Sequence, residues 1–321
     1  MNPWVVIALR RSAQALAVAL IVGTLCFVMM RLLPGDLATR VAAGRYGYDL
    51  VGNAAADAVR AELGLDRPAW QALMLWWGDI LRMDLGVSMV SGEPVSEELA
   101  HQLSATVHLS LVAILLALAV GVPAGVMAGL RPGGVWDRLT LAGAVVLRAL
   151  PTFLVALLLM LALAVQLGAL PVAGDGHAAS VLLPATTLAL ALAAGLARIT
   201  RDTLVALQRS PDWFFALSKG LSPGQVLWRH GARRLALPAT AYLGVHAALL
   251  IEGAVVVETL FAWPGIGHAL VHAVFGRDVP VIQGAALTMG LLFVLLSAAV
   301  DALCLTLDPR RRLAQTGGHH G

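Results

Sequence analysis

The chain has little charge for its length and almost no cysteine. Of its 321 residues, 13% are charged and 59% are hydrophobic, whereas a soluble domain carries about 25% charged residues. Its two cysteines, Cys26 and Cys304, both lie inside apolar segments and show no metal-ligand spacing. This composition excludes a soluble globule and a disulfide-stabilised secreted domain, and it indicates a protein embedded in a membrane.

Sequence signatures of catalysis are also missing. No Gly-x-x-x-x-Gly-Lys-Ser/Thr segment occurs, so nothing in the sequence could cradle nucleotide phosphates. An intramembrane hydrolase would need paired carboxylates, a Ser–His pair or a metal cluster within the apolar segments, and none is evident. His268 and His272 have the i, i+4 spacing of a metal site, but without an acidic partner we interpret them as a polar helix face. We therefore expect no catalytic residue, no metal and no cofactor in this chain.

Six apolar segments are long enough to cross a bilayer, which takes about 20 helical residues. Because lipid offers the backbone no hydrogen-bond partner, each segment is expected to be a helix. The first is followed by Arg31-Leu-Leu-Pro-Gly-Asp36 instead of a cleavage site of small residues, so we expect it to be retained. The six segments run approximately over residues 13–32, 105–130, 139–168, 181–206, 236–261 and 281–306.

The basic residues between these segments predict the orientation of the chain. If six spans are counted, four basic groups fall on one side of the membrane, which the positive-inside rule makes the cytoplasmic side. Both termini are then cytoplasmic. The groups are Arg10 and Arg11; Arg131 and Arg138; Arg198, Arg201, Arg209, Lys219, Arg229, Arg233 and Arg234; and Arg310, Arg311 and Arg312.

The spans divide the chain into four parts. Residues 1–33 form the N-terminal tail and first span, 34–104 an acidic outer element, 105–307 a five-helix core, and 308–321 a cytoplasmic tail. The core includes a cytoplasmic loop over residues 207–238. Two stretches of the outer element, Ala54–Leu63 and Pro68–Met83, are expected to be helical. The second carries Trp70, Trp76 and Trp77. These aromatic residues either form a docking surface for a partner, or they have a structural role as an interfacial belt or a small core.

The cytoplasmic loop has the sequence pattern of two short helices. Asp212 is expected to cap a helix over Trp213–Lys219, and Gly220 is expected to end it. Ser222 followed by Pro223 begins a second helix. Three aromatic side chains, Trp213, Phe214 and Phe215, are expected to be exposed, either to a partner with a hydrophobic groove or to the lipid surface.

This loop resembles the coupling loop, or EAA motif, of ABC-importer permeases, with Gly220 as its central glycine. The resemblance is to the branch that imports dipeptides, oligopeptides and nickel. The matching segments of the loop are Ala216-Leu-Ser-Lys-Gly-Leu-Ser222, Arg229-His230 and Leu237-Pro238. Further matches cover nearly the whole chain. They are Arg31-Leu-Leu-Pro-Gly-Asp36, Leu63-Gly-Leu-Asp-Arg-Pro68, Asp84-Leu-Gly-Val-Ser88, Pro151-Thr-Phe153, Val257-Glu-Thr-Leu-Phe-Ala-Trp-Pro-Gly-Ile-Gly267, Arg277-Asp-Val-Pro280 and Asp308-Pro-Arg310.

The resemblance implies an all-α type I ABC importer (MetI-like) permease fold with six transmembrane helices and an outer-face element between the first and second. It implies a multi-pass protein of the bacterial inner membrane that is not itself an enzyme. ATP and Mg would be bound by two separate ATPase subunits, and the chain would pair with a second, homologous permease. A periplasmic or lipid-anchored binding protein would deliver the substrate, and no nucleic acid is involved. Contacts to the ATPase are expected from Asp212, Trp213, Phe214, Phe215, Ala216, Lys219, Gly220 and Leu221.

The expected substrate is a di- or oligopeptide, and the alternative is nickel or a metal chelate carried by the same machinery. A secondary transporter is a remote alternative, because it would predict inverted repeats and ion sites instead of an aromatic coupling loop.

Two charges inside the spans depart from the pattern of the branch, which usually has apolar or small residues there. Arg148 and Glu252 either form an ion pair between the third and fifth spans or line the translocation pathway. The remaining motif residues are interpreted as structural. Glu258 is expected to support the turn around Pro264, where glycine allows positive φ, and Pro34-Gly35 to break the helix at the membrane exit, where Asp36 reaches water. These structural residues are Pro34, Gly35, Asp36, Glu258, Pro264, Gly265 and Gly267.

Overall fold

The computed structural model describes residues 3–32, 36, 38–39, 42–43, 52–62, 67–172 and 179–307. Within these helical ranges, the side chains of residues 30, 62, 230, 247–249, 251 and 252 are not described. Helices are the only extended regular elements of these ranges, and an isolated β-bridge joins Val87 to Pro94. The prediction of an all-α protein is confirmed. Pro34, Gly35 and the tail over residues 308–321 lie outside the described residues.

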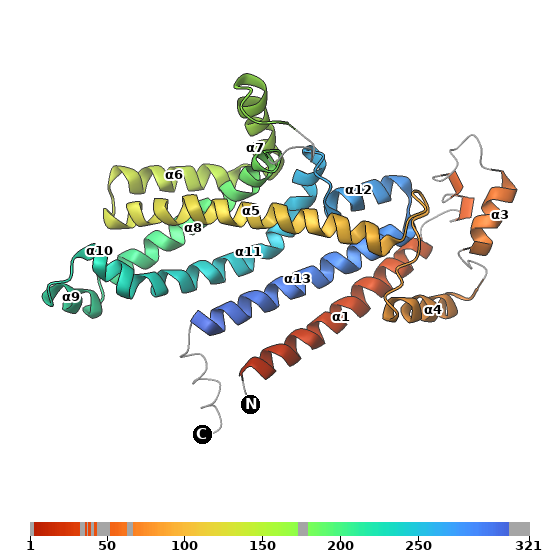
Figure 1. Cartoon of the computed structure of the whole chain (residues 1–321), viewed down its shortest axis with the longest axis horizontal. Helices are drawn as coiled ribbons and strands as arrows, with labels where there is room; N and C mark the ends of the chain where they lie inside the picture. Colours follow the sequence, from red (N-terminus) through yellow and green to blue (C-terminus); the bar gives the residue numbers. More distant parts are fainter. Residues whose placement is uncertain are drawn as a thin grey trace. The chain divides into compact units, whose positions relative to one another are not determined.

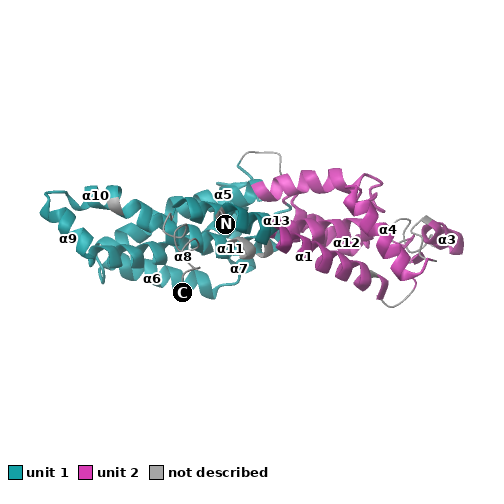
Figure 2. Cartoon of the chain, turned by 90° about the horizontal axis from the view of Figure 1, so that it is seen from below, with its two compact units in different colours: residues 1–11, 108–262, 295–321 teal, residues 12–107, 263–294 magenta. Residues whose placement is uncertain are grey.

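The chain divides into two compact units (Figure 2), and three of the four boundaries between them fall inside long helices. Unit 1 holds residues 1–11, 108–262 and 295–321, and unit 2 holds residues 12–107 and 263–294. The helices shared by both units are α1 (Pro3–Leu32), α5 (Val95–Leu130) and α13 (Val279–Leu307).

Unit 1 is built around α8 (Leu182–Gln208), whose buried residues run along most of its length. Helix α8 contacts α6 (Val135–Ala149), α7 (Thr152–Leu159) and α11 (Ala232–Leu260), all of which are labelled in Figure 1. The unit also contains the π-helix η2 (Met160–Gln166). At the α8 end, a turn leads to α9 (Pro211–Ser218), α10 (Pro223–Val226) and the π-helix η3 (Leu227–Gly231), which runs into α11.

Glycines bring α5 unusually close to α8. A Cβ atom at Gly121 would stand 2.7 Å from the carbonyl oxygen of Ala193 and 2.9 Å from the Cβ of Leu196. Gly125, one turn further along, faces Ala197 of α8, and a Cβ at Gly129, one turn beyond that, would stand 3.0 Å from Leu204. Small residues four apart allow two membrane helices to approach at the level of their backbones. This stripe therefore fixes where α5 lies on α8.

The third predicted span is not one continuous helix. Helix α6 ends at Ala149, α7 begins at Thr152, and the two segments are bent by 110°. Leu150 is extended, with φ −85° and ψ 132°, because the ring of Pro151 disfavours the helical conformation in the residue before it. The segment predicted to span over residues 139–168 is therefore broken by a corner at Leu150 and Pro151.

Unit 2 contains α3 (Asn53–Glu62), α4 (Ala69–Leu81) and α12 (Ile266–Gly276). The first two match the helices predicted for the outer element. Trp76 and Trp77 of α4 are half-buried, and a Cβ at Gly23 of α1 would stand 3.0 Å from Trp76. Trp70 is exposed. Trp76 and Trp77 therefore serve as a small core against α1.

Hydrogen bonds and apolar packing join α12 to the start of α5. The indole N–H of Trp263 donates to the carbonyl of Ala105 at 3.0 Å, and the backbone N–H of Ile266 donates to the hydroxyl of Thr106 at 2.9 Å. Ile266 also belongs to an apolar core cluster. Its buried members are Val95, Leu99, Ile266, Ala273, Val281 and Ala285.

The turn before α12 differs from the expectation of glycines with positive φ. Gly265 has φ −95° and ψ 172° at the N-cap of α12, and Gly267 is buried within that helix. The residue with positive φ is Ala262, at 49°. The N–H of Gly265 donates to the carbonyl of Trp263 at 2.7 Å, while Pro264 between them has no N–H to donate. This short hydrogen bond and the positive φ of Ala262 together make the bend.

Among the described residues, four helices are long and apolar enough to cross a membrane, and the bent α6–α7 pair could make five. The four are α5, α8, α13 and the Trp4–Met29 part of α1. Helix α11, which corresponds to the fifth predicted span, has 29 residues but is not among these. It carries Arg233 and Arg234 at its start and Glu258 near its end. The chain is therefore a multi-pass membrane protein.

Candidate functional site

The cytoplasmic loop predicted from the sequence is a pair of short helices, α9 and α10, in unit 1. Helix α9 begins with Ser210 as its N-cap and Pro211 in the first helical turn. Asp212 was predicted to be the cap, but Pro211 extends the helix by one residue and places Asp212 inside its first turn. Its carboxylate instead forms an exposed ion pair with the guanidinium of Arg234, at the start of α11.

Trp213 lies inside the molecule, contrary to the prediction that all three aromatic side chains are exposed. Trp213 and Ala216 are each 6% exposed. Because residues i and i+3 share a helix face, both point at the ends of α8 and α11. They pack in one apolar cluster. Its buried members are Leu204, Leu207, Trp213, Ala216, Val226 and Leu235.

Phe214 and Phe215 form the outward face of α9. Their side chains are 62% and 63% exposed. The Lys219 ammonium lies 4.3 Å from the centre of the Phe215 ring, which is a cation–π contact. This contact involves Phe215 and not Phe214. Two adjacent exposed phenylalanines on a helix that is held from behind by Trp213 constitute an apolar contact surface, which we call the α9 face: Phe214, Phe215 and Lys219.

Gly220 ends α9 as predicted. Its φ of 85° is in the left-handed region that favours glycine. The N–H of Gly220 donates to the carbonyl of Leu217 at 2.9 Å, and that of Leu221 donates to Ala216 at 3.3 Å. This pair of bonds is the Schellman motif, and Leu221 packs on the Trp213 cluster as that motif requires.

The second helix of the loop begins as predicted, at Ser222 and Pro223. The Ser222 N–H donates to the Gln225 side-chain oxygen at 2.9 Å, and the Gln225 N–H donates to the Ser222 hydroxyl at 3.4 Å. This reciprocal capping box satisfies two helix-terminal donors. Local hydrogen bonds therefore fix both the end of α9 and the start of α10. These bonds hold the α9 face in a defined position relative to α10.

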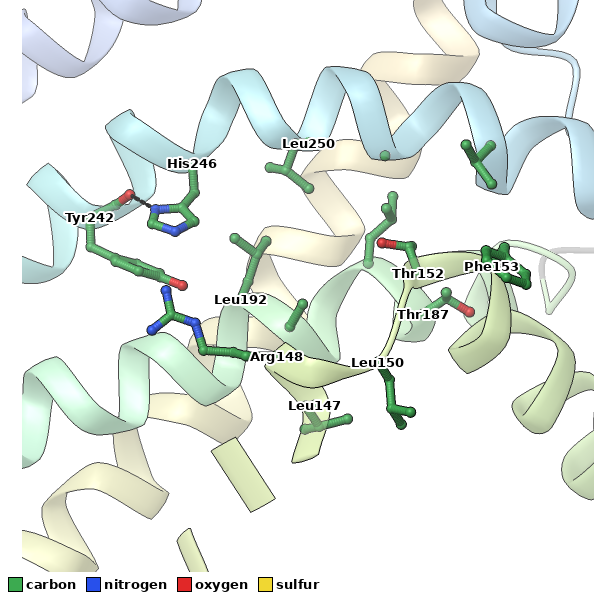
Figure 3. A pocket seen from close by; sticks show the side chains of 14 residues that line it. Leu147, Arg148, Leu150, Thr152, Phe153, Thr187, Leu192, Tyr242, His246 and Leu250 are labelled. Atoms are coloured by element: carbon green, nitrogen blue, oxygen red, sulfur yellow. Dashed lines mark hydrogen bonds between the residues drawn. The ribbon is translucent and has the colours of Figure 1, made fainter. Parts of the chain in front are cut away.

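A second candidate site is a cavity of about 480 Å³ in unit 1, between α6, α7, α8 and α11 (Figure 3). Ligand pockets typically have volumes of about 300–1,000 Å³. Most of the lining is aliphatic or aromatic, and the polar side chains are those of Arg148, Thr152, Thr187, Tyr242 and His246. Among the lining residues that the structure describes, the cavity therefore has a mostly apolar wall and one charged side chain, that of Arg148.

Arg148 enters this cavity from the last turn of α6, next to the corner at Pro151. Figure 3 shows its guanidinium pointing to the hydroxyl of Tyr242. Arg148 is exposed, and it forms no ion pair with any side chain that the structure describes. The side chain of Glu252, its predicted alternative partner, lies outside that description.

Tyr242 and His246 were not identified from the sequence. They lie one turn apart on α11 with ring centres 3.9 Å apart and ring planes inclined by 31°. The His246 Nδ1 lies 3.0 Å from the carbonyl oxygen of Tyr242. Since a carbonyl oxygen only accepts, Nδ1–H is the donor, and in the neutral ring Nε2 is an acceptor. Their i, i+4 spacing within an apolar span was the available signal.

Asp137 links the first turn of α6 to α8. Its side chain is 8% exposed, and its carboxylate accepts from Arg201 at 2.7 Å and from Arg198 at 3.4 Å. The N–H of Gly133 donates to the same carboxylate at 2.8 Å. Arg201 also contacts the exposed Asp202 at 2.9 Å. Two of the basic residues that indicated the orientation therefore also hold these helices together.

His268 and His272 belong to unit 2 and stack edge to face, with ring centres 4.3 Å apart. Burial and the neighbouring His272 lower the pKa of His268 below its usual value. They line a hollow of about 490 Å³ that also contains Glu98 and Gln102. No group of three or more metal-ligating side chains occurs among the described residues.

The structural motif residues are distributed over both units. Glu258 is completely buried on α11, next to the buried Val257. In unit 2, Asp36 accepts from the N–H of Thr39 at 3.2 Å and from Arg60 at 2.9 Å. Hydrogen bonds from Thr39 and the charge of Arg60 lower the pKa of Asp36. Neither residue lies in the cavity or on the α9 face.

Comparisons with known proteins agree with these features. Residues 121–313 match the family described as binding-protein-dependent transport system inner membrane component. A relative from Brucella abortus, named as a candidate peptide transport system permease protein, is 37% identical over 95% of this chain and 98% of the relative. The glutathione transport system permease protein GsiC of Pectobacterium atrosepticum is 36% identical over 95% of this chain and 98% of its own length.

A solved structure shows the same fold. A chain of the inward-facing MetNI methionine ABC transporter superposes with a TM-score of 0.52 at 17% identity, covering 65% of this chain and 96% of that chain. At that identity, the likeness concerns the fold alone. The MetI-like architecture predicted from the sequence is confirmed at this level.

Proposed function

The chain belongs to the family of binding-protein-dependent transport system inner membrane components, and we propose from this that it is one permease subunit of an ATP-driven peptide importer. The α9 face is the observation that carries the proposal. A pair of exposed phenylalanines on a helix with both ends locally fixed is suited to enter a hydrophobic cleft and to transmit force. The chain would take up no ATP itself, since its sequence has no phosphate-binding loop.

Two separate ATPase subunits would bind ATP and Mg, and their closure would move the α9 face. The displacement would pass to the membrane helices because Trp213 and Ala216 pack on the ends of α8 and α11. In this role, Phe214, Phe215 and Lys219 touch the ATPase directly. Trp213, Ala216, Gly220 and Leu221 keep the helix in place, and Asp212 ties it to Arg234.

The assembly would contain a second, homologous permease, because an alternating-access path needs two halves around it. A binding protein on the outer side would deliver the substrate. We propose six spans, with α11 as the fifth, and both termini in the cytoplasm. The charges at the start of α11, Arg233 and Arg234, then lie on the cytoplasmic side, where basic residues are enriched.

The substrate class we propose is a di- or oligopeptide. The named relatives from Brucella and Pectobacterium are described as peptide and glutathione transport permeases, and glutathione is itself a peptide derivative. Nickel or a metal chelate is the alternative, with the same machinery. Reconstituted proteoliposomes containing the full complex and its binding protein separate them: ATP-dependent uptake of a labelled peptide supports the proposal, and uptake of nickel in its place contradicts it.

Arg148 and Glu252 are proposed to line the translocation pathway. The position of Arg148 on a cavity within the helical core supports this role. Exchanging the two charges, as Arg148→Glu with Glu252→Arg, tests it. A stably assembled double variant that has lost transport supports the pathway role, whereas full transport supports a structural ion pair.

A further inference from the structure

The corner at Leu150–Pro151 determines where the charge of Arg148 lies. Because α6 stops at Ala149 and the chain turns by 110°, Arg148 stands on the last helical turn. Its neighbours Leu147 and Leu150 line the same cavity. Figure 3 shows the guanidinium beside Tyr242, among the side chains that line this cavity. A straight helix would have continued past this position without presenting its end to the cavity.

The cavity presents a single formal charge among its described lining residues. Apart from Arg148, its polar groups are neutral hydroxyls and one imidazole, and the rest of the wall is apolar. An ionisable group at membrane depth is expensive unless it faces water or an opposite charge. A cavity of about 480 Å³ around it has room for either. Arg148 is therefore placed to receive an anionic group in this cavity.

The neighbouring groups are complementary to one end of a peptide. A guanidinium presents a planar fork of donors that matches a carboxylate. The Tyr242 hydroxyl, to which the guanidinium points in Figure 3, adds a further donor. The Nε2 atom of His246 is left as an acceptor for a peptide N–H, because Nδ1–H is engaged by the Tyr242 carbonyl.

We propose that Arg148 and Tyr242 bind the carboxylate of the transported molecule during its passage, with His246 accepting an N–H group beside it. This inference rests on the proposed import function and names the chemistry by which the pathway recognises a peptide-like acid. The carboxylate subsite consists of Arg148, Tyr242 and His246. A substrate whose carboxylate is blocked as an amide would pass with much weaker contact to this subsite.

The test uses the purified complex with its ATPase subunits and without its binding protein, so that only the membrane site is probed. The melting temperature is measured against increasing trialanine, and separately against trialanine amide. We expect trialanine to stabilise the wild type and the amide to stabilise it far less. Arg148→Gln should weaken the effect of trialanine by roughly tenfold or more, since hydrogen bonds to charged groups are the strong ones. Arg148→Lys should retain part of it, and Tyr242→Phe should weaken it.

Arg138→Gln is the matched control, because Arg138 is an exposed arginine on the same helix outside the cavity. It should leave the response to trialanine unchanged. Equal stabilisation by acid and amide, no stabilisation by either, or a full response in Arg148→Gln would overturn the subsite. A structural ion pair would also overturn the subsite. It would show as equal losses of melting temperature in Arg148→Gln and Glu252→Gln without ligand, together with recovery in the charge-exchanged double variant. Absence of ATPase subunits from the wild-type preparation would contradict the import function instead.

Discussion

The hydroxyl group of Tyr242 lies directly over the backbone of Gly195. A Cβ atom at Gly195 would stand 2.8 Å from the Cε2 atom of the Tyr242 ring and nearer still to its hydroxyl oxygen. Helix α8 therefore admits the ring only because residue 195 has no side chain. The ring in turn sets the wall of the cavity in which Arg148 lies.

Gly195→Ala is expected to push the Tyr242 ring out of its place. Overpacking of this kind costs about 1–3 kcal/mol, and both the melting temperature of the complex and its transport rate should fall. Tyr242→Phe should not relieve the clash, because ring carbons also lie too close. Adding Tyr242→Leu to the Gly195→Ala variant should restore stability, because the ring is removed, but should not restore transport. A Gly195→Ala variant that is as stable and active as the wild type would show that the ring position is unimportant.

Gly121→Ala is expected to separate α5 from α8. Its Cβ would meet the carbonyl oxygen of Ala193 at 2.7 Å, and a backbone atom has no rotamer by which to yield. We expect a loss of about 1–3 kcal/mol, seen as a lower melting temperature in detergent. Gly143→Ala is the matched control, since nothing lies within 4 Å of a Cβ there. Equal behaviour of the two variants would refute the close packing.

Gly220→Ala isolates the conformation of the coupling turn. No atom lies within 4 Å of a Cβ at Gly220, so the cost is the left-handed backbone alone, about 1–2 kcal/mol. We expect reduced ATP-driven transport with the permease still inserted in the membrane. Gly224→Ala, at a position equally open and without positive φ, should be silent. Normal transport by Gly220→Ala would mean that the turn tolerates the strain.

Asp137→Asn removes the charge that joins α6 to α8. The carboxylate receives two arginines and a backbone N–H, and hydrogen bonds to charged groups are worth about 1.5–3 kcal/mol. We expect a clear drop in melting temperature. Asp202→Asn, which alters the exposed partner of Arg201, should change it little, because exposed ion pairs contribute about 0–1 kcal/mol. A larger effect at Asp202 than at Asp137 would reverse this assignment.

Much of the fold could be predicted because its signals are local. Long apolar runs mark helices, and Gly220 and Ser222-Pro223 determine the turn of the cytoplasmic loop through bonds to residues only a few positions away. The corner at Pro151 was missed because a proline in an apolar run is compatible with a kink as well as a break.

The errors at the candidate site have a different cause. The burial of Trp213 depends on what lies beneath α9, and eight residues of helix do not reveal it. The meeting of Arg148 with Tyr242 joins positions nearly one hundred residues apart, which no local pattern specifies. The approach of Gly121 to α8 is similar, since a glycine in a span predicts closeness without naming the neighbour.

The central claim, that the α9 face engages an ATPase, is tested most directly by purifying the tagged chain in mild detergent and identifying what accompanies it. The wild type should carry ATPase subunits and a second permease. Phe214→Asp with Phe215→Asp should lose the ATPases and keep the second permease, because both side chains are exposed and their loss leaves the Trp213 cluster intact. Phe275→Asp, at an exposed aromatic residue on α12, is the control and should keep both. Purification of the wild type without any ATPase, or an unchanged ATPase yield in the double variant, would contradict the account.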